Sequence, residues 1–233
     1  MNNILFVIVI YRIRKEQSVA WNQLNALLGE DADNIHVHDN TDNNVYLAKA
    51  YNEAADVARK RGMKWIVILD SDTQITADYI DCIKKKAIGE DDKVYCPILV
   101  NAEGGMLSPK KQYGIPIAFN SGMMIPIRVI DKTGGFNEQY PLDYLDYWFC
   151  YKLRELKIDL VPLDINITHC LSLMDYDTLP LWRYQSILKA EKQFAIETGN
   201  TNRYRIYLIG RLVKWLITGH AYTKETFKAL ISI

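Results

Sequence analysis

The chain has 233 residues, of which 49% are hydrophobic, so it is long enough for one large domain or two small ones with a substantial core. Lys plus Arg and Asp plus Glu both number 28, and this zero net charge gives no indication of duplex nucleic acid as a partner. The four cysteines are Cys82, Cys96, Cys150 and Cys170, and no two of them form a CxxC pair. This spacing argues against a zinc site or a redox dithiol and is typical of reduced, mostly buried thiols in a cytosolic protein.

Strands and helices alternate through the first hundred residues. Residues 3–11 (NILFVIVIY) are apolar but lack a basic leader and a cleavage site, so we expect a buried strand rather than a secretory signal. No run reaches the roughly 18 apolar residues of a membrane span. The expected strands are 3–11, 35–38, 65–69 and 94–100, and the expected helices are 16–28, 45–61 and 77–88, the last capped by Thr76.

Residues 65–74 (WIVILDSDTQ) are the most informative stretch for function. Five large apolar residues predict a strand buried on both faces of a parallel sheet. Asp70 and Asp72 follow at its carboxyl end, where open α/β sheets bind ligands. Carboxylates at this edge hold a divalent cation on phosphate oxygens or attack a phosphoryl group. The alternative is that both are turn formers that cap the next helix.

A polar cluster at residues 39–44 (DNTDNN) follows the second expected strand. An aspartate at a strand end can accept hydrogen bonds from a ribose or a base, although a plain loop is the alternative. Further along, residues 101–114 are expected to form a loop or short hairpin, and residues 115–125 to be extended. The glycine in Asn120-Ser121-Gly122 is typical of the close approach of a ligand or another backbone.

Acidic and aromatic residues gather in the second half of the chain. A short helix is expected at 128–133, and a longer helix within 141–156 would carry Asp143 and Asp146 on one face, either as functional carboxylates or as caps favoured by the helix dipole. A strand is expected at 159–163, and residues 165–169 lead to His169; a lone histidine is more often structural than a ligand.

The last part of the chain is expected to be helical at 179–197, 204–218 and 224–231. The middle helix is apolar around most of its circumference, with Arg203, Arg211 and Lys214 on one side. This pattern suits burial against the domain or in a homodimer, and it also suits peripheral contact of residues 203–218 with an anionic membrane.

The chain contains neither GxGxxG nor GxxxxGK[ST], which argues against a dinucleotide fold and a P-loop. The order of its motifs resembles a family 2 glycosyltransferase with the GT-A fold, closest to the bacterial rhamnosyltransferase-like branch. The resemblance covers about residues 3–188. Its motifs are DN at 39–40, NVYLAKAYN at 44–52, DSD at 70–72, NSG at 120–122, GGFN at 134–137, DYLD with Cys150 and Arg154 at 143–154, ITH at 167–169 and WRY at 182–184.

The resemblance implies an α/β fold in which helices flank a mostly parallel central sheet. It places a GT-A domain at 1–200, with a nucleotide-sugar half at about 1–100 and an acceptor half at about 101–200, followed by a helical extension at 201–233. The implied activity is inverting, metal-dependent transfer of a sugar from a nucleotide-diphosphate donor to a saccharide or lipid-linked saccharide. The implied setting is bacterial surface polysaccharide synthesis in the cytoplasm, or peripherally at the inner face of the plasma membrane.

The resemblance also implies roles for individual residues. Asp143 is the first candidate for the base and Asp146 the second. The cofactor is Mn²⁺ or Mg²⁺, held by Asp72, Asp70 and His169. The donor site comprises Tyr11, Asp39, Asn40, Asn44, Asn52, Asp70, Ser71 and Asp72, and the acceptor site comprises Asn120, Ser121, Gly122, Trp182 and Arg183.

The chain departs from the family pattern at two places. Tyr46 stands where the family has a helix-start glycine, and Asp143-Tyr144 replaces the common Glu-Asp pair. Two other readings compete with the resemblance. A phosphatase-like hydrolase with Asp70 as nucleophile would need Thr or Val at position 74, which is Gln, and would carry its motif after the first strand. The second is a non-catalytic module of the same fold that binds a nucleotide sugar or a glycan.

Overall fold

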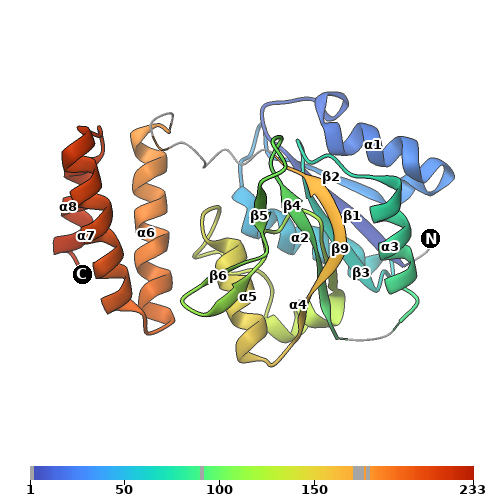
Figure 1. The fold of residues 1–233 in the computed structure, drawn as a ribbon. Coiled ribbons are helices and arrows are strands. Elements are labelled where there is room, and N and C mark those ends of the chain that lie inside the picture. Colours follow the sequence, from blue (N-terminus) through green and yellow to red (C-terminus); the bar gives the residue numbers. More distant parts are fainter. Residues whose placement is uncertain (1–2, 90–91, 170–175, 177–178) are drawn as a thin grey trace. The chain divides into compact units, whose positions relative to one another are not determined.

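The computed structural model describes residues 3–89, 92–169, 176 and 179–233 (Figure 1). Packing divides the chain into two compact units, 1–170 and 171–233. The first unit holds the sheet and the helices that cover it, and the second holds three helices. The predicted functional division at residue 200 stays a prediction. By their packing, residues 181–197 belong with the C-terminal helices.

The first unit is built on one mixed sheet with the strand order β2-β1-β3-β8-β4-β5, and β9 pairs alongside β4. The β1–β2, β1–β3 and β4–β9 pairs are parallel and form the longest ladders. The β3–β8, β4–β8 and β4–β5 pairs are antiparallel. The strands are β1 (Ile4–Ile10), β2 (Ile35–Asp39), β3 (Trp65–Asp70), β4 (Val94–Val100), β5 (Met106–Ser108), β8 (Met123–Pro126) and β9 (Leu160–Thr168), with a separate hairpin of β6 (Lys110–Gln112) and β7 (Ile115–Ile117).

Apolar runs form the centre of this sheet. Ile4 to Ile8 of β1 are fully buried, and Trp65 to Leu69 of β3 are at most 2% exposed, because both strands have neighbours on each side and helices over their faces (Figure 1). The predicted strands and helices of the first hundred residues are confirmed to within a few residues. The helices are α1 (Val19–Leu28), α2 (Tyr46–Lys60), α3 (Ala77–Lys86), α4 (Ile127–Thr133) and α5 (Leu145–Glu155), with short 3₁₀ turns η1 (Lys15–Gln17) and η2 (Gly29–Asn34).

Local signals set several helix ends. The Thr76 hydroxyl accepts a hydrogen bond from the Tyr79 amide at 3.2 Å, as predicted for an N-cap. Helix α4 ends at Gly134, whose φ of 79° is left-handed. The strand expected at 159–163 is longer in the structure, because β9 continues to Thr168, directly before His169.

The prediction that Asp143 and Asp146 share a helical face is wrong. Helix α5 begins at Leu145, and its N-cap Tyr144 has a left-handed φ of 62°. That conformation turns the backbone away from the helical path, so Asp143 precedes the helix while Asp146 lies in its first turn.

The second unit comprises α6 (Leu181–Glu197), α7 (Thr201–Thr218) and α8 (Thr223–Ile231). Its core contains aromatic residues such as Tyr184 and Trp215. The predicted placement of Arg211 on a basic outer side of α7 is wrong. Arg211 is 7% exposed and donates two hydrogen bonds to the Glu191 carboxylate, at 2.7 and 3.1 Å, because a buried guanidinium requires a paired anion.

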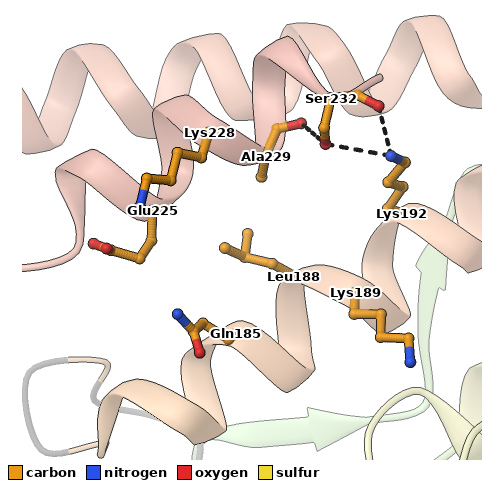
Figure 2. A pocket seen from close by; sticks show the side chains of 8 residues that line it. All are labelled: Gln185, Leu188, Lys189, Lys192, Glu225, Lys228, Ala229 and Ser232. Carbon is orange, nitrogen blue, oxygen red and sulfur yellow. Dashed lines mark hydrogen bonds between the residues drawn. The ribbon is translucent and has the colours of Figure 1, made fainter.

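Helices α6 and α8 border a groove within the second unit (Figure 2). At one end, the Lys192 ammonium donates to the Ser232 carbonyl at 2.6 Å. None of the predicted site residues lines this groove. Across the described ranges, no helix combines the length and the apolarity needed to cross a membrane.

Three of the cysteines fall within the described residues, and all three are free thiols. Cys96 and Cys150 are buried as predicted, and Cys82 is half-buried. Cys170 lies outside the described residues.

Candidate active site

The DSD stretch lies at the carboxyl end of β3, as predicted. Asp70 is the last residue of the strand, and the chain then turns so that Gln74 pairs with Thr168, the last residue of β9. The Gln74 amide donates to the Thr168 carbonyl at 2.9 Å. This single antiparallel bridge brings His169 beside the two aspartates, although it lies far from them in the sequence.

His169 lies between the two carboxylates. Its Nε2 is 3.3 Å from Asp70 Oδ2, and its Nδ1 is 3.3 Å from Asp72 Oδ1. The imidazole is 8% exposed, whereas the side chains of Asp70 and Asp72 are 33% and 47% exposed. The cluster therefore has a buried imidazole paired with two carboxylates that remain partly accessible from solvent.

Two buried hydroxyls, of Ser121 and Thr73, form hydrogen bonds with this cluster. The Ser121 hydroxyl accepts a hydrogen bond from the Asp70 amide at 3.0 Å and lies 2.5 Å from the Thr73 hydroxyl. The Thr73 hydroxyl in turn lies 3.3 Å from Nδ1 of His169. Ser121, predicted as an acceptor-site residue, thus belongs to the network that positions the DSD stretch.

The charges of the cluster influence one another. Burial raises the pKa of Asp70, and the nearby Asp72 carboxylate raises it further, while His169 opposes both effects. Burial alone would lower the pKa of His169. The hydrogen bond to Asp72 and the charges of both carboxylates outweigh burial, so the pKa of His169 is raised above its ordinary value.

The donor set is chemically suited to a divalent cation, because two carboxylates and an imidazole are ligands that Mn²⁺ accepts. In the described residues, however, no three side chains of His, Cys, Asp or Glu are arranged around a common point. Each aspartate instead faces one nitrogen of His169. A cation would therefore have to replace at least one of these ion pairs.

Two further carboxylates precede or begin α5. Asp143 is 5% exposed. Asp146 Oδ1 accepts a hydrogen bond from the Tyr147 amide at 2.9 Å, and burial raises the pKa of Asp146 to about 7. The Asp146 carboxylate is also influenced by Asp70 and by the ammonium of Lys110, so it lies within electrostatic range of the DSD cluster.

The predicted donor residues at the ends of β1 and β2 lie in two adjacent loops. Tyr11 directly follows β1, is 45% exposed and has the Arg12 guanidinium 4.9 Å from its ring centre. Asp39 ends β2 and accepts a hydrogen bond from the Thr41 amide at 2.8 Å. Hydrogen bonding to the Thr41 side chain, and next to the Thr41 amide, lowers the pKa of Asp39.

The neighbouring asparagines hold the loop in shape. Asn40 is 3% exposed; its Oδ1 accepts from the Val45 amide at 3.2 Å, and its Nδ2 donates to the Tyr46 carbonyl at 3.3 Å. Asn44 Oδ1 accepts from the Tyr46 amide at 2.9 Å. Both side-chain amides therefore have a structural use, and their predicted contacts with a nucleotide stay predictions.

Comparison with known proteins decides the family. The model of glycosyl transferase family 2 matches residues 20–155, which is more than half of the chain and includes the DSD stretch and all of α5. The chain belongs to glycosyltransferase family 2. No curated protein matches the chain in sequence.

Solved structures share the fold of the chain. S. aureus TarS gives a TM-score of 0.52 at 11% identity, covering 84% of this chain and 39% of that chain. TarS 1-349 in complex with UDP gives 0.52 at 12% identity, covering 83% and 65%, and its complex with UDP-GlcNAc gives 0.53 at 12% identity, covering 84% and 66%. The chain thus spans about 39% of TarS, and the predicted GT-A-type α/β fold is confirmed.

The first departure from the family pattern has a structural explanation. Tyr46 has a left-handed φ of 61°, a conformation that glycine adopts readily and other residues rarely do. The next two amides, of Leu47 and Ala48, donate to the Pro141 carbonyl at 2.8 and 3.1 Å. The start of α2 is thereby tied to the segment that carries Asp143, and this attachment requires the unusual backbone conformation at Tyr46.

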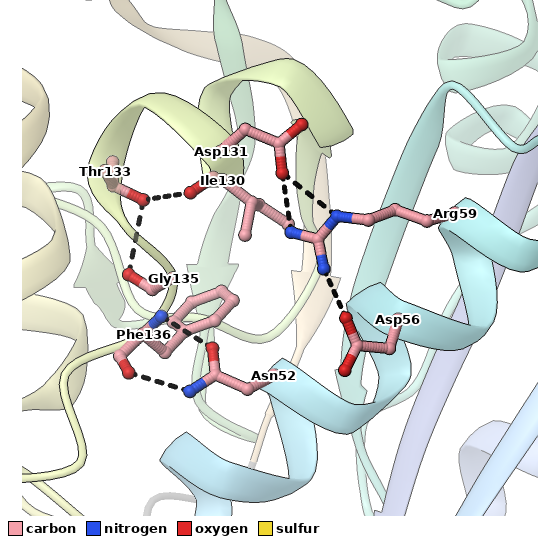
Figure 3. Close-up of polar contacts among 8 residues, drawn as sticks. All are labelled: Asn52, Asp56, Arg59, Ile130, Asp131, Thr133, Gly135 and Phe136. Atoms are coloured by element: carbon pink, nitrogen blue, oxygen red, sulfur yellow. Dashed lines mark hydrogen bonds and ion pairs between the residues drawn. The ribbon is translucent and has the colours of Figure 1, made fainter.

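Asn52 has its contacts at the loop after α4 (Figure 3). Its amide receives a hydrogen bond from the Phe136 amide at 2.7 Å and donates to the Phe136 carbonyl at 2.9 Å. A side chain at Gly135 would place its Cβ 2.8 Å from Asn52 Oδ1. Nearby, Arg59 donates twice to Asp131 Oδ1, at 2.6 and 3.0 Å, and joins the same two helices. A structural role therefore accounts for Asn52, and its predicted donor contact stays a prediction.

The remaining predicted residues are dispersed. Gly122 has φ of 78°, and a Cβ there would lie 2.5 Å from Pro97 and 2.6 Å from Ile167, so packing rather than a ligand requires the glycine. Asn120 is 8% exposed. Trp182 and Arg183 lie in the second unit. Trp182 is 61% exposed, and Arg183 is half-buried.

Sequence reasoning missed three residues that touch or influence this site. Thr73 directly follows the DSD stretch. This position next to Asp72 was the one sequence feature that could have indicated its role in the site. Tyr51 is buried, and its burial and the charges of Asp70 and Asp146 raise the pKa of its phenol. The Lys110 ammonium lies 4.5 Å from the Phe119 ring centre and acts electrostatically on Asp146. Nothing in the sequence around Lys110 indicated this position.

Proposed function

We propose that this chain is an inverting, metal-dependent glycosyltransferase that moves a sugar from a nucleotide-diphosphate donor to a hydroxyl of a saccharide or lipid-linked saccharide. The observation that carries the proposal is the cluster of Asp70, Asp72 and His169 at the sheet edge of a family 2 glycosyltransferase. Synthesis of a bacterial surface polysaccharide is the process we propose for it, with a rhamnosyl or another hexosyl group as the sugar.

The donor is the first partner to identify. One structurally similar protein, TarS 1-349, has been crystallised with UDP and with UDP-GlcNAc. This likeness supports uridine diphosphate sugars as the first donors to test. The nucleotide contacts that we propose come from the loops after β1 and β2, which contain Tyr11, Asp39, Asn40 and Asn44.

A metal ion is the second component. We propose that Asp72 and Asp70 hold Mn²⁺ or Mg²⁺, with His169 as a third ligand once an ion pair with a carboxylate has opened. When bound, the cation would neutralise the negative charge that develops on the leaving diphosphate. Ser121 and Thr73 keep the DSD turn in place for this role through their buried hydrogen bonds.

The base is a carboxylate of the acidic segment. In a single displacement, the acceptor oxygen bonds to the anomeric carbon, the bond to the diphosphate breaks, and the hydroxyl proton passes to the base. A pKa of about 7 supports Asp146 in this role, because a base is most effective when its pKa lies near the working pH. Asp143, the first candidate from the sequence, is more deeply buried and is the second candidate here.

The test is a donor screen by thermal shift. UDP, GDP, dTDP and CMP are each added with and without Mn²⁺, because a ligand that binds only the folded chain raises its melting temperature. We expect one nucleoside diphosphate to stabilise the wild type only with Mn²⁺, and Asp72→Asn to abolish that shift. Asp78→Asn, at an exposed aspartate in the first turn of α3, is the matched control and should keep it.

Two results would contradict the proposal. A shift that is unchanged in Asp72→Asn would remove the metal role of the DSD stretch. Metal-dependent donor binding without release of the sugar, either to an acceptor or to water, would favour the non-catalytic module instead.

A further inference from the structure

Helix α7 has a second apolar face. The first face is buried in the core of the second unit and includes Tyr204, Leu208 and Trp215. On the opposite side, aliphatic residues recur at spacings of three and four and form a continuous row, whereas exposed apolar residues on a protein surface are usually scattered singly. The members of this aliphatic row are 49–81% exposed: Ile206, Ile209, Val213, Leu216 and Ile217.

Basic residues border the aliphatic row. The sequence of α7 contains four basic residues and no acidic residue. Arg211 is turned inward to Glu191, but Arg203, Arg205 and Lys214 are exposed. At 3.6 residues per turn, Arg205 falls on one edge of the row and the other two on the opposite edge. Both borders of the apolar face therefore carry positive charge.

The charge of the whole second unit has the same sign. Residues 171–233 contain nine Lys or Arg and five Asp or Glu, so their formal charge is positive although the full chain is neutral. A polar border of one sign around an apolar strip is the pattern of helices that lie in the interface of an anionic bilayer. Such a helix does not need the length or apolarity of a membrane span.

We propose that the aliphatic row of α7 docks on the surface of an anionic membrane, with its aliphatic side chains at the headgroup and acyl boundary and its three exposed basic residues against lipid phosphates. This inference does not rest on the proposed glycosyltransferase reaction. It concerns only where the second unit binds, and its test measures no turnover.

A second copy of the chain is the competing occupant, because a spacing of three and four also suits a coiled coil. Coiled coils place residues of opposite charge beside the apolar seam. Two copies of α7 would bring only basic residues together there, and like charges oppose association. The charge pattern therefore favours a lipid surface over a second copy.

The experiment is co-sedimentation of the full chain with vesicles. We expect sedimentation with phosphatidylcholine vesicles that contain about 30% phosphatidylglycerol, and little with pure phosphatidylcholine, because the basic border needs anionic headgroups. The double variant Ile209→Asp/Leu216→Asp should reduce the bound fraction about tenfold, since it removes apolar burial and adds repelled charge. Ile88→Asp, at an exposed isoleucine of the first unit, is the matched control and should bind as the wild type does.

A charge variant separates the two parts of the surface. Arg205→Gln/Lys214→Gln should lose most binding to anionic vesicles while its circular dichroism stays unchanged, because both side chains are exposed. Failure of the wild type to sediment would overturn the proposal, as would undiminished binding by the Ile209→Asp/Leu216→Asp variant. A concentration-dependent dimer by light scattering, lost in that same variant without lipid, would assign the row to a second copy instead.

Discussion

At the scale of single residues, the chemistry of the site depends on where charges are buried. Asp146 lies in the first turn of α5 and is influenced by Lys110 and Asp70. Burial is the largest of these effects and raises the pKa of Asp146 to about 7. An ordinary surface aspartate would be charged throughout the physiological range, whereas this one changes its charge there.

This burial predicts a linked effect of Asp146→Asn on activity and stability. If Asp146 is the base, kcat/KM of the wild type rises with pH and reaches half its limit near pH 7, and Asp146→Asn lowers it by about 10²–10⁴-fold. Because the folded pKa is raised, the contribution of Asp146 to stability is fully present below pH 3.8 and is lost as the pH rises to about 7. The neutral Asn variant should therefore melt at a higher temperature than the wild type at pH 8.

Lys110→Met provides the control for this assignment. The Lys110 ammonium lowers the pKa of Asp146, so its removal should move the rise in kcat/KM to higher pH without abolishing turnover. An unshifted pH profile in Lys110→Met, or full turnover in Asp146→Asn, would transfer the role of base to Asp143.

At the scale of secondary structure elements, the site is held by contacts between strands that are distant in sequence. The turn before β8 fits between β4 and β9 only because Gly122 has no side chain. Its amide also donates to the Ile68 carbonyl of β3 at 2.7 Å. The same turn carries Ser121, whose hydroxyl supports Asp70. Packing at one glycine is thereby coupled to the position of the DSD stretch.

Gly122→Ala should destabilise the fold by about 2–4 kcal/mol, because the new Cβ would overlap Pro97 and Ile167 and the backbone is left-handed. Gly114→Ala is the matched control. Gly114 has a similar φ of 80°, but a Cβ added there would have no atom within 4 Å, so only the backbone cost of about 1 kcal/mol applies. Urea unfolding followed by circular dichroism measures both, and equal losses would show that the crowding at Gly122 is relieved by small shifts.

At the scale of the whole molecule, the chain consists of two compact units with their own cores. The first core is organised by the sheet and combines aliphatic strand residues with aromatic residues such as Phe6, Trp65 and Phe149. The second is aromatic and includes a buried ion pair between Glu191 and Arg211. The guanidinium of this pair also donates to the hydroxyls of Tyr184 and Tyr207, at 3.3 and 2.7 Å. The Arg211 guanidinium is therefore paired and hydrogen-bonded within the second unit.

Removing one partner of this pair should destabilise the second unit. Arg211→Met leaves the Glu191 carboxylate buried without its cation, which costs about 3–5 kcal/mol. Hydrogen exchange should accelerate in the peptides of α6 and α7. Arg205→Met, at an exposed arginine of the same helix, should change stability by less than about 0.5 kcal/mol. If the double variant Glu191→Leu/Arg211→Met is no more stable than Arg211→Met, the loss is one of packing rather than of an unpaired charge.

Local sequence patterns were enough to predict most of the elements and to place the DSD stretch. Apolar runs predicted β1 and β3, helical spacing and caps predicted α2 and α3, and the DSD stretch was placed correctly at a strand end. These features depend on neighbours within a few positions, which is why periodicity and capping reveal them. The order of the motifs also indicated the family, which the family model then confirmed.

Only the tertiary structure decided which of these residues meet. It placed His169 between Asp70 and Asp72 through the pairing of Gln74 with Thr168, separated Asp143 from the helix that holds Asp146, and turned Arg211 inward to Glu191. Each outcome depends on a contact between distant segments or on one unusual backbone angle. Local patterns carry no information about such contacts, because the free energy that selects them comes from burial and pairing across the whole unit.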